Sequence, residues 1–154
     1  MSDRASDRAI FTRRLRAALR DLTVKYFGDE DETSWQAGGC WLLAEALRIL
    51  LGGKLWAFVY ERRGRPSIEH VVVRTSEGLY ADAHGLQTKR ELLRQFAADT
   101  DGRSVSYPLV RFSEKDQQRI MEEGGIGRIY CDTQMPFDAP QLAEELATRI
   151  SASR

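Results

Sequence analysis

Residues 38–53 have the sequence GGCWLLAEALRILLGG. From Cys40 onward the side chains are apolar almost all round, with Glu45 and Arg48 as the exceptions. This pattern predicts a largely buried helix that starts near Cys40, and the pair Gly52–Gly53 predicts its end. A helix of this kind must pack against other elements, so the chain on either side is expected to supply them.

Three segments after this helix have the composition of β-strands. Each is rich in aromatic or branched residues and is bounded by turn-forming residues. The first two strands are separated by the turn-like segment Arg62–Ser67. We expect the three to form an antiparallel meander. The predicted strands are Lys54–Glu61, Ile68–Arg74 and Gly78–Ala83.

Helical patterns flank this predicted sheet on both sides. Apolar residues recur every three to five positions in the first of them, and the later ones begin with residues that cap helices. Between them Ser104–Phe112 is expected to be an edge strand, because Pro108 cannot donate a hydrogen bond to a central one. The predicted helices are Ser6–Phe27, Thr88–Ala98 with the capping pair Thr88 and Glu91, Ser113–Glu123 capped by Ser113, and a last helix from Asp138, with Gln141 as its capping partner, to about Ile150.

The length of 154 residues suits one domain with a single core. We therefore expect an α+β fold with N-terminal helices, a buried helix bearing the cysteine on an antiparallel sheet of three or more strands, and peripheral C-terminal helices. Residues 1–34 would form the N-terminal helix and an acidic loop, residues 35–112 the core, and residues 113–154 the C-terminal helices.

Composition excludes several classes of protein. A hydrophobic content of 42% argues against a disordered chain, and 23 basic against 23 acidic residues give no net charge to attract nucleic acid or anionic lipid. The excess of cations in residues 1–27 is answered by the acidic run Asp29–Glu32, which favours a solvated helix face. Apolar runs are too short to cross a membrane, no signal peptide is visible, and two cysteines are too few for a disulfide scaffold. We expect a cytoplasmic protein that binds neither nucleic acid nor membrane.

Cys40 is the first candidate for chemistry, because it begins the predicted buried helix. A thiol is a good nucleophile only as a thiolate, and the unpaired N–H groups and dipole of a helix N-terminus favour negative charge. Gly38–Gly39 would let the backbone approach a carbonyl group, with the Cys40 N–H and the Gln36 side chain as oxyanion donors. Gly39 and Trp41 complete the candidate oxyanion and substrate-binding set. The alternative is that Cys40 is a small buried hydrophobic residue.

His70 and Asp82 are the candidate base and its partner. His70 lies within an apolar strand, where both ring nitrogens need hydrogen-bond partners. The loop Thr75–Gly78 fits a type I turn followed by a left-handed glycine, which pairs Thr75 with Leu79. In that register His70 lies opposite His84, and His70 and Asp82 are diagonal neighbours on one face. The alternative is a core histidine bonded to the backbone.

These residues supply a thiol, an imidazole and a carboxylate in that chain order, as in enzymes where the carboxylate orients the base and the base activates the sulfur. Residues 38–41 resemble the Cys-Trp helix start of papain-like cysteine peptidases, which follows an oxyanion-hole glutamine. Residues 69–73 (EHVVV) and 78–85 (GLYADAHG) resemble the histidine strand and the Asp-x-x-Gly strand of transglutaminase-like proteins. The resemblance covers about residues 35–85. The short gap from Cys40 to His70 is closer to transglutaminase-like or minimal bacterial thiol hydrolase cores than to papain, where it is ~130 residues.

The resemblance implies a thiol-dependent hydrolase or acyltransferase that needs no cofactor and acts on an amide bond of a peptide or protein substrate. Cys40 would attack the carbonyl carbon, His70 would transfer the proton, and Asp82 would orient the imidazole. Peptide hydrolysis, glutamine deamidation, amidation and acyl transfer all fit this chemistry. Hydrolysis is favoured, because water is the default acceptor.

Two other interpretations use the same side chains. A non-catalytic accessory module, for example of a phage or mobile element, would keep the fold and use its basic first helix as a partner surface. Cys40, His70, Asp82 and His84 are also possible zinc ligands, although no close pair such as C-x-x-C accompanies them. Cys131 has no histidine near it in sequence and is expected to be structural.

Overall fold

The computed structural model describes residues 3–27, 35, 39–102, 107–122 and 137–152. As predicted, the fold is α+β, and its sheet is antiparallel with the strand order β4-β3-β2-β1-β5. The strands are β1 (Lys54–Arg62), β2 (Arg65–Arg74), β3 (Tyr80–Asp82), β4 (Gly85–Gln87) and β5 (Leu109–Arg111). The helices of the described residues are α1 (Arg4–Phe27), α3 (Cys40–Leu51), α4 (Lys89–Asp99), α5 (Glu114–Glu122) and α7 (Ala139–Ala152).

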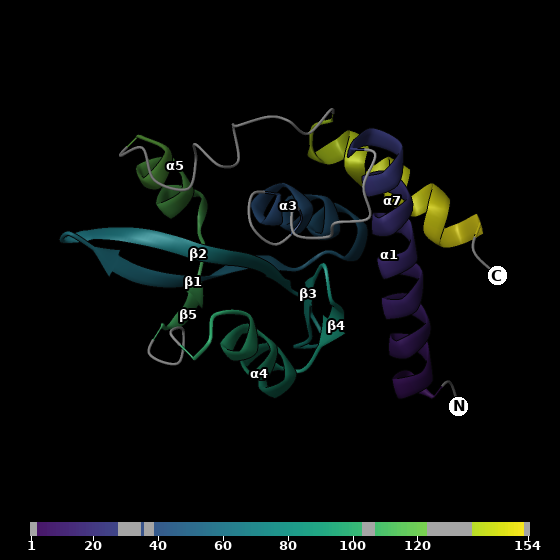
Figure 1. Cartoon of the computed structure of the whole chain (residues 1–154), viewed down its shortest axis with the longest axis horizontal. Helices are drawn as coiled ribbons and strands as arrows, with labels where there is room; N and C mark the ends of the chain where they lie inside the picture. Colours follow the sequence, from purple (N-terminus) through teal and green to yellow (C-terminus); the bar gives the residue numbers. More distant parts are fainter. Residues whose placement is uncertain (1–2, 28–34, 36–38, 103–106, 123–136, 153–154) are drawn as a thin grey trace.

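The sheet carries α3 on one face and α4 on the other, and each helix has its own core (Figure 1). Alternation along the strands divides their side chains between the two faces. Ala57 and Val71 belong to the larger core around α3, whereas Phe58 and Val72 belong to the smaller core, where they meet Phe96 of α4. The strands at the centre of the sheet are therefore buried on both sides.

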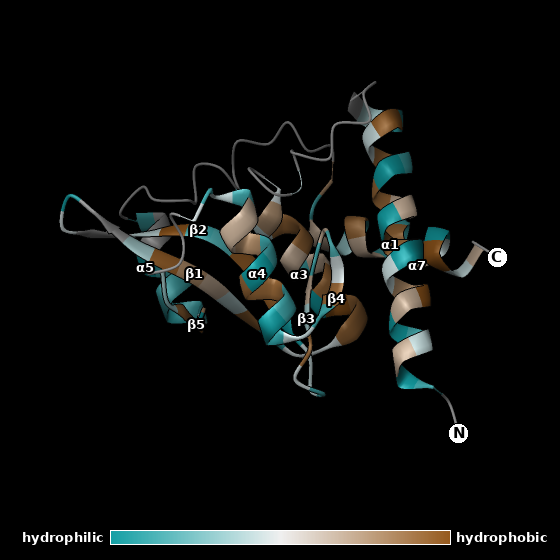
Figure 2. Ribbon diagram, turned by 60° about the horizontal axis from the view of Figure 1, so that its bottom comes forward, coloured by the Kyte–Doolittle hydropathy of each residue, from teal (hydrophilic) through white to brown (hydrophobic). Residues whose placement is uncertain are grey.

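The helix α3 is buried as predicted, and Figure 2 shows its largely apolar colouring. From Cys40 to Leu47 every residue except Glu45 is buried. The helix ends before Gly52, whose N–H donates to the carbonyl of Arg48 at 2.8 Å. Within the part of the chain that the structure describes, no helix has both the length and the apolar character needed to cross a membrane.

The helix α7 packs on α3, and α1 packs on α7 and on β4. α1 begins at Arg4, two residues before the predicted start, because the Asp3 carboxylate accepts the N–H of Ala5 at 3.2 Å. α7 packs deeper than a peripheral helix, since Leu142 and Leu146 are fully buried against α3 and α1. The main core therefore unites both ends of the described chain with its middle.

The turn predicted at Arg62–Ser67 is shorter in the structure. β1 and β2 pair as far as Arg62 and Arg65, so the turn consists of Arg63 and Gly64, both with positive φ. Two such residues give the tight turn whose twist matches that of a hairpin. The second strand was predicted to begin at Ile68, but it begins at Arg65 and contains Pro66. β2 accommodates a proline because, among the described strands, β3 pairs with β2 only at Val73–Arg74.

The third predicted strand, Gly78–Ala83, is in fact the start of a further hairpin. β3 covers Tyr80–Asp82 only, and residues 83–84 turn the chain into β4. The predicted register of β3 is confirmed, because Val73 pairs with Ala81 and the N–H of Thr75 donates to the carbonyl of Leu79. The prediction that His84 lies opposite His70 is wrong, since the chain has left β2 before it reaches His84. At the other edge, β5 confirms the predicted edge strand next to Pro108.

The predicted helix caps are confirmed. Thr88 and Glu91 exchange hydrogen bonds as a complete capping box. Asp138 and Gln141 do the same at the start of α7. The hydroxyl of Ser113 accepts a backbone N–H at the start of α5. These caps satisfy N–H groups that have no partner within the helix, and for this reason they could be recognised from local sequence.

We predict that Gly53→Ala destabilises the protein more than Gly78→Ala. Both glycines have positive φ, near +92° and +81°, so both substitutions carry a cost of about 1 kcal/mol or more for that conformation. A Cβ at Gly53 would also lie 2.1 Å from the carbonyl oxygen of Arg74, whereas at Gly78 it would meet no atom within 4 Å. We expect an extra loss of about 1–3 kcal/mol for Gly53→Ala, measured by urea unfolding. Equal losses would contradict the close approach of Gly53 to Arg74.

Candidate functional site

Cys40 is the first residue of α3, and Gly39 precedes it as the N-cap residue. The Gly39 carbonyl accepts the N–H of Leu43 at 2.8 Å, so Gly39 closes the first turn of the helix, which has no side-chain cap. The thiol therefore lies where the helix dipole favours negative charge. Only 2% of Cys40 is exposed.

His70 and Asp82 form the central interaction of the site. The Nε2 atom of His70 lies 3.0 Å from the Oδ2 atom of Asp82, and both residues are buried. The loop Thr75–Gly78 produces this pairing as predicted, because its left-handed glycine sets the register of β3 against β2. The diagonal relationship expected between His70 and Asp82 is thus the one that the structure contains.

A β-bulge in β2 lies directly before His70. Phe58 pairs with His70 but Val59 pairs with Ile68, so Glu69 is the extra residue. The bulge separates the side chains of Ile68 and His70, which simple alternation would place on one face. Ile68 belongs to the core around α3, whereas the His70 ring stacks on Phe96 of α4, with ring centroids 5.7 Å apart and planes at 20°.

The Asp82 carboxylate is held through both of its oxygens. Oδ2 contacts His70, and Oδ1 accepts the backbone N–H of His84 at 2.8 Å. The second bond is an Asx-type bond made possible by the turn between β3 and β4. It orients the carboxylate toward the imidazole, so Asp82 is well suited to position His70.

Cys40 and His70 interact although they belong to different layers of the fold. Burial by itself lowers the pKa of His70, but hydrogen bonds to Asp82 and to Cys40, together with the charges of both groups, outweigh burial and raise the pKa from 6.5 to about 10. Since Asp82 occupies Nε2, the ring nitrogen left for the sulfur is Nδ1. The imidazole therefore has the Asp82 carboxylate as one partner and the Cys40 thiol as another, and both favour its protonated form.

This arrangement can support nucleophilic chemistry at the sulfur. A protonated imidazole stabilises a thiolate beside it and can later give its proton to a leaving group. The exposed fractions of Cys40, His70 and Asp82 are only 2, 6 and 3%. A substrate carbonyl would reach the sulfur only after a local movement of the groups that cover it.

The other residues of the predicted site have different fates. Trp41 is buried in the main core, with its ring centroid 5.0 Å from that of Phe112. It packs the start of α3 and is as deeply buried as Cys40, so its predicted part in substrate binding stays a prediction. Gln36 and Cys131 lie outside the described residues.

The four residues considered for zinc do not form a ligand set. The Nε2 atom of His84 lies 3.4 Å from the Oδ2 atom of Asp99 in α4, while the backbone N–H of His84 donates to Asp82. Across the described ranges, no three His, Cys, Asp or Glu side chains are grouped so that they could hold a metal ion. The zinc alternative therefore has no geometric support there.

Three features of the site were not predicted. They are the stacking of Phe96 on His70, the bulge at Glu69 and the hydrogen bond from the His84 backbone to Asp82. Only the last had a local signal, because an Asp two residues before a polar residue and a glycine is typical of an Asx turn. The other two depend on contacts between elements distant in the sequence.

Comparison of the chain with protein-family models, with curated proteins and with solved structures finds no match. The resemblance to papain-like and transglutaminase-like enzymes stays a prediction that rests on the residues of the site.

We predict that His70 keeps its proton through neutral pH. A group whose pKa is raised to about 10 is protonated below that pH, so its ring signals should not titrate between pH 6 and 8.5. Asp82→Asn should lower the pKa, because it removes the charge and weakens the hydrogen bond that hold the proton. Histidine NMR signals measured against pH test this directly. The chain has 2 histidines, and His84→Gln assigns them. Titration of His70 near pH 6.5 in the unaltered protein would contradict the prediction.

Proposed function

We propose that the protein is a thiol-dependent hydrolase or acyltransferase that acts on an amide bond, of the peptide or glutamine type, in a peptide or protein substrate. The observation that carries the proposal is the buried contact of the His70 imidazole with the Asp82 carboxylate, with the Cys40 thiol at a helix N-terminus as the second partner of the imidazole. Cys40, His70 and Asp82 are the proposed catalytic residues.

The proposed reaction begins with attack of the Cys40 thiolate on the carbonyl carbon of the amide. Backbone N–H groups of the first turn of α3, which have no acceptor within the helix, are suited to receive the negative charge on the oxygen. His70 donates its proton to the nitrogen as the C–N bond breaks, which leaves a thioester on Cys40. His70 then takes a proton from water, which attacks the thioester and releases the acid. An amine in place of water would give acyl transfer.

Alkylation of Cys40 by iodoacetamide tests whether its sulfur is activated. In a Cys131→Ser background, we expect Cys40 to react at pH 7 at least tenfold faster than in the same protein with His70→Gln, because the imidazolium stabilises the thiolate. His84→Gln is the matched control: it removes the other histidine and leaves the backbone bond to Asp82 in place. Mass spectrometry against time gives the rates.

The outcome of the labelling separates the proposed enzyme from a non-catalytic binding module with the same fold. Slow labelling of Cys40 that is equal with and without His70 would contradict an activated thiol. Turnover is then sought with a fluorescent casein for hydrolysis and with amine incorporation into casein for acyl transfer. Cys40→Ser should abolish either activity.

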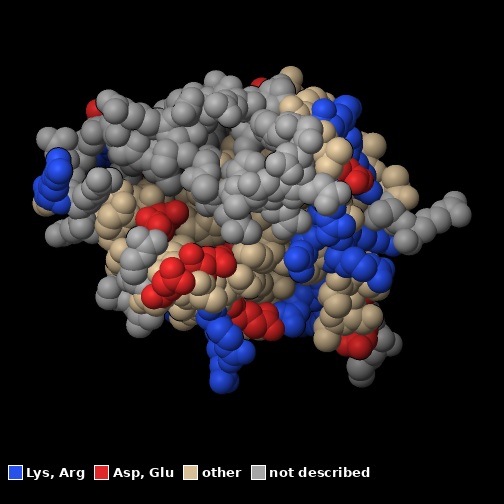
Figure 3. Space-filling view, viewed as in Figure 1, with Lys and Arg blue, Asp and Glu red and all other residues tan. Residues whose placement is uncertain are grey.

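A non-catalytic binding module is the second candidate function, and the surface of α1 favours it. Arg13, Arg16 and Arg20 are exposed there, and Figure 3 shows Lys and Arg gathered over this helix. Val24 and Tyr26 are also exposed, at 45% and 38%. A face that combines cations with apolar side chains suits an acidic protein partner. Unactivated Cys40 in the labelling experiment would favour this function.

A further inference from the structure

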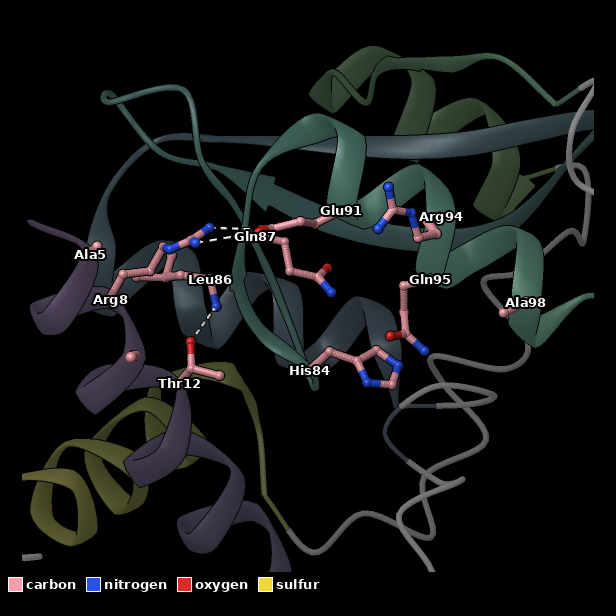
Figure 4. Close-up of a pocket in the computed structure, with 11 residues that line it drawn as sticks. Ala5, Arg8, Thr12, His84, Leu86, Gln87, Glu91, Arg94, Gln95 and Ala98 are labelled. Carbon is pink, nitrogen blue, oxygen red and sulfur yellow. Dashed lines mark hydrogen bonds and ion pairs between the residues drawn. The ribbon is translucent and has the colours of Figure 1, made fainter.

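A cavity of about 550 Å³ lies between α1, the end of the sheet at β4, and α4. It is separate from the thiol site, since none of Cys40, His70 and Asp82 lines it. Its walls combine small apolar side chains with long polar ones, as ligand sites usually do. Figure 4 shows Gln87, Gln95 and His84 pointing toward one another across this space, with Arg94 above them.

The charges of the lining residues leave one cation without a partner. Arg8 of α1 is paired with Glu91 of α4, with Nη1 2.7 Å from Oε2, so these two charges cancel. Arg94 makes no hydrogen bond or ion pair with any of the residues that the structure describes. Its planar guanidinium is suited to a carboxylate, which it can bind through two N–H groups. The cavity therefore matches a ligand with a single negative charge.

Two buried polar atoms of the cavity lining also lack a hydrogen-bond partner among the residues that the structure describes. They are Oε1 of Gln87 and Nε2 of His84, and the latter lies 3.4 Å from the Asp99 carboxylate without hydrogen-bond geometry. Buried polar atoms are normally bonded, so an unbonded pair that lines one cavity indicates that something else completes it. The Gln87 oxygen requires a donor such as an amide N–H.

We propose that this cavity binds a carboxylate that has an amide N–H beside it, as in an N-acylated amino acid or the C-terminus of a peptide. Arg94 would bind the carboxylate, Gln87 would accept the amide N–H, and the small side chains of Ala5, Ala9 and Ala98 would contact the aliphatic part. A dianion such as phosphate would exceed the single positive charge, that of Arg94, which the described lining leaves unpaired. This binding does not depend on the proposed activity of Cys40.

The probes are N-acetyl-alanine, its neutral amide N-acetyl-alaninamide, the tripeptide N-acetyl-Ala-Ala-Ala with a free carboxylate, and inorganic phosphate. Binding is followed by the NMR shifts of the Gln87 and Gln95 side-chain amides and the Leu86 N–H. We expect N-acetyl-alanine to bind with a Kd on the order of 1 mM, and the neutral amide at least tenfold more weakly. Tighter binding of the tripeptide would identify a peptide C-terminus as the natural ligand, and equal binding a free acyl amino acid.

Arg94→Gln should weaken N-acetyl-alanine binding at least fivefold, whereas Arg90→Gln should leave it unchanged. Arg90 is an exposed arginine on the same helix that does not line the cavity, so it controls for general charge. The Cys40→Ser protein should bind N-acetyl-alanine as tightly as the unaltered protein. A failure of the proposed thiol chemistry would therefore leave this binding unchanged. Equal affinities for N-acetyl-alanine and its amide, tighter binding of phosphate, or no effect of Arg94→Gln would overturn the proposal.

Discussion

A helix that is apolar on nearly every side is stable in water only when other elements cover it, and α3 is such a helix. The sheet and α7 pack against it, and α1 packs in turn on α7 and β4 (Figure 1). The first residue of α3 is Cys40, so the burial that stabilises the helix also withdraws the thiol from water. The site is thus a product of core packing, and its electrostatic interactions act in a medium that screens them weakly.

His70 and Asp82 are buried polar groups in places where an apolar side chain would pack without cost. Each buried polar atom requires a partner, or its desolvation is left uncompensated. The structure supplies those partners. The Asp82 carboxylate contacts the His70 imidazole and accepts the backbone N–H of His84, and Cys40 is the second partner of the imidazole. A network of this kind orients its members more strictly than apolar packing would. Orientation of a base beside a sulfur is what thiol chemistry would need, and this network is the physical basis of the proposed function.

The parts of the fold that could be predicted are those with local causes. Capping at Thr88, Ser113 and Asp138 depends on residues within one turn, and the left-handed glycine of the Thr75–Gly78 loop sets the register that brings His70 to Asp82. The errors arise where a distant segment intervenes. The short turn at Arg63–Gly64 is compatible with Pro66 because β3 pairs with β2 only at Val73–Arg74. The edge of β2 that faces away from β1 therefore needs no N–H donor at Pro66.

The roles of single side chains in the site were harder to predict than the strands that carry them. Trp41 follows the candidate nucleophile and was a candidate for substrate binding, and it is buried against Phe112, which is distant in sequence. His84 was expected beside His70, but the second hairpin carries it to the cavity between α1 and α4. In both cases the surroundings of the side chain depend on which distant element packs against it, and the periodicity of the sequence does not predict that element.

Periodicity, caps and one turn were sufficient to establish from the amino-acid order an α+β domain, a buried helix that begins at Cys40, and the pairing of His70 with Asp82. These features depend on interactions between residues close in the chain, or across one short loop, whose geometry is nearly independent of context. Tertiary packing alone determined that the sulfur meets the imidazole, that Phe96 supports it, and that a cavity forms beside β4. Such features require segments from different layers to meet, and their positions follow from filling one common core rather than from any local rule.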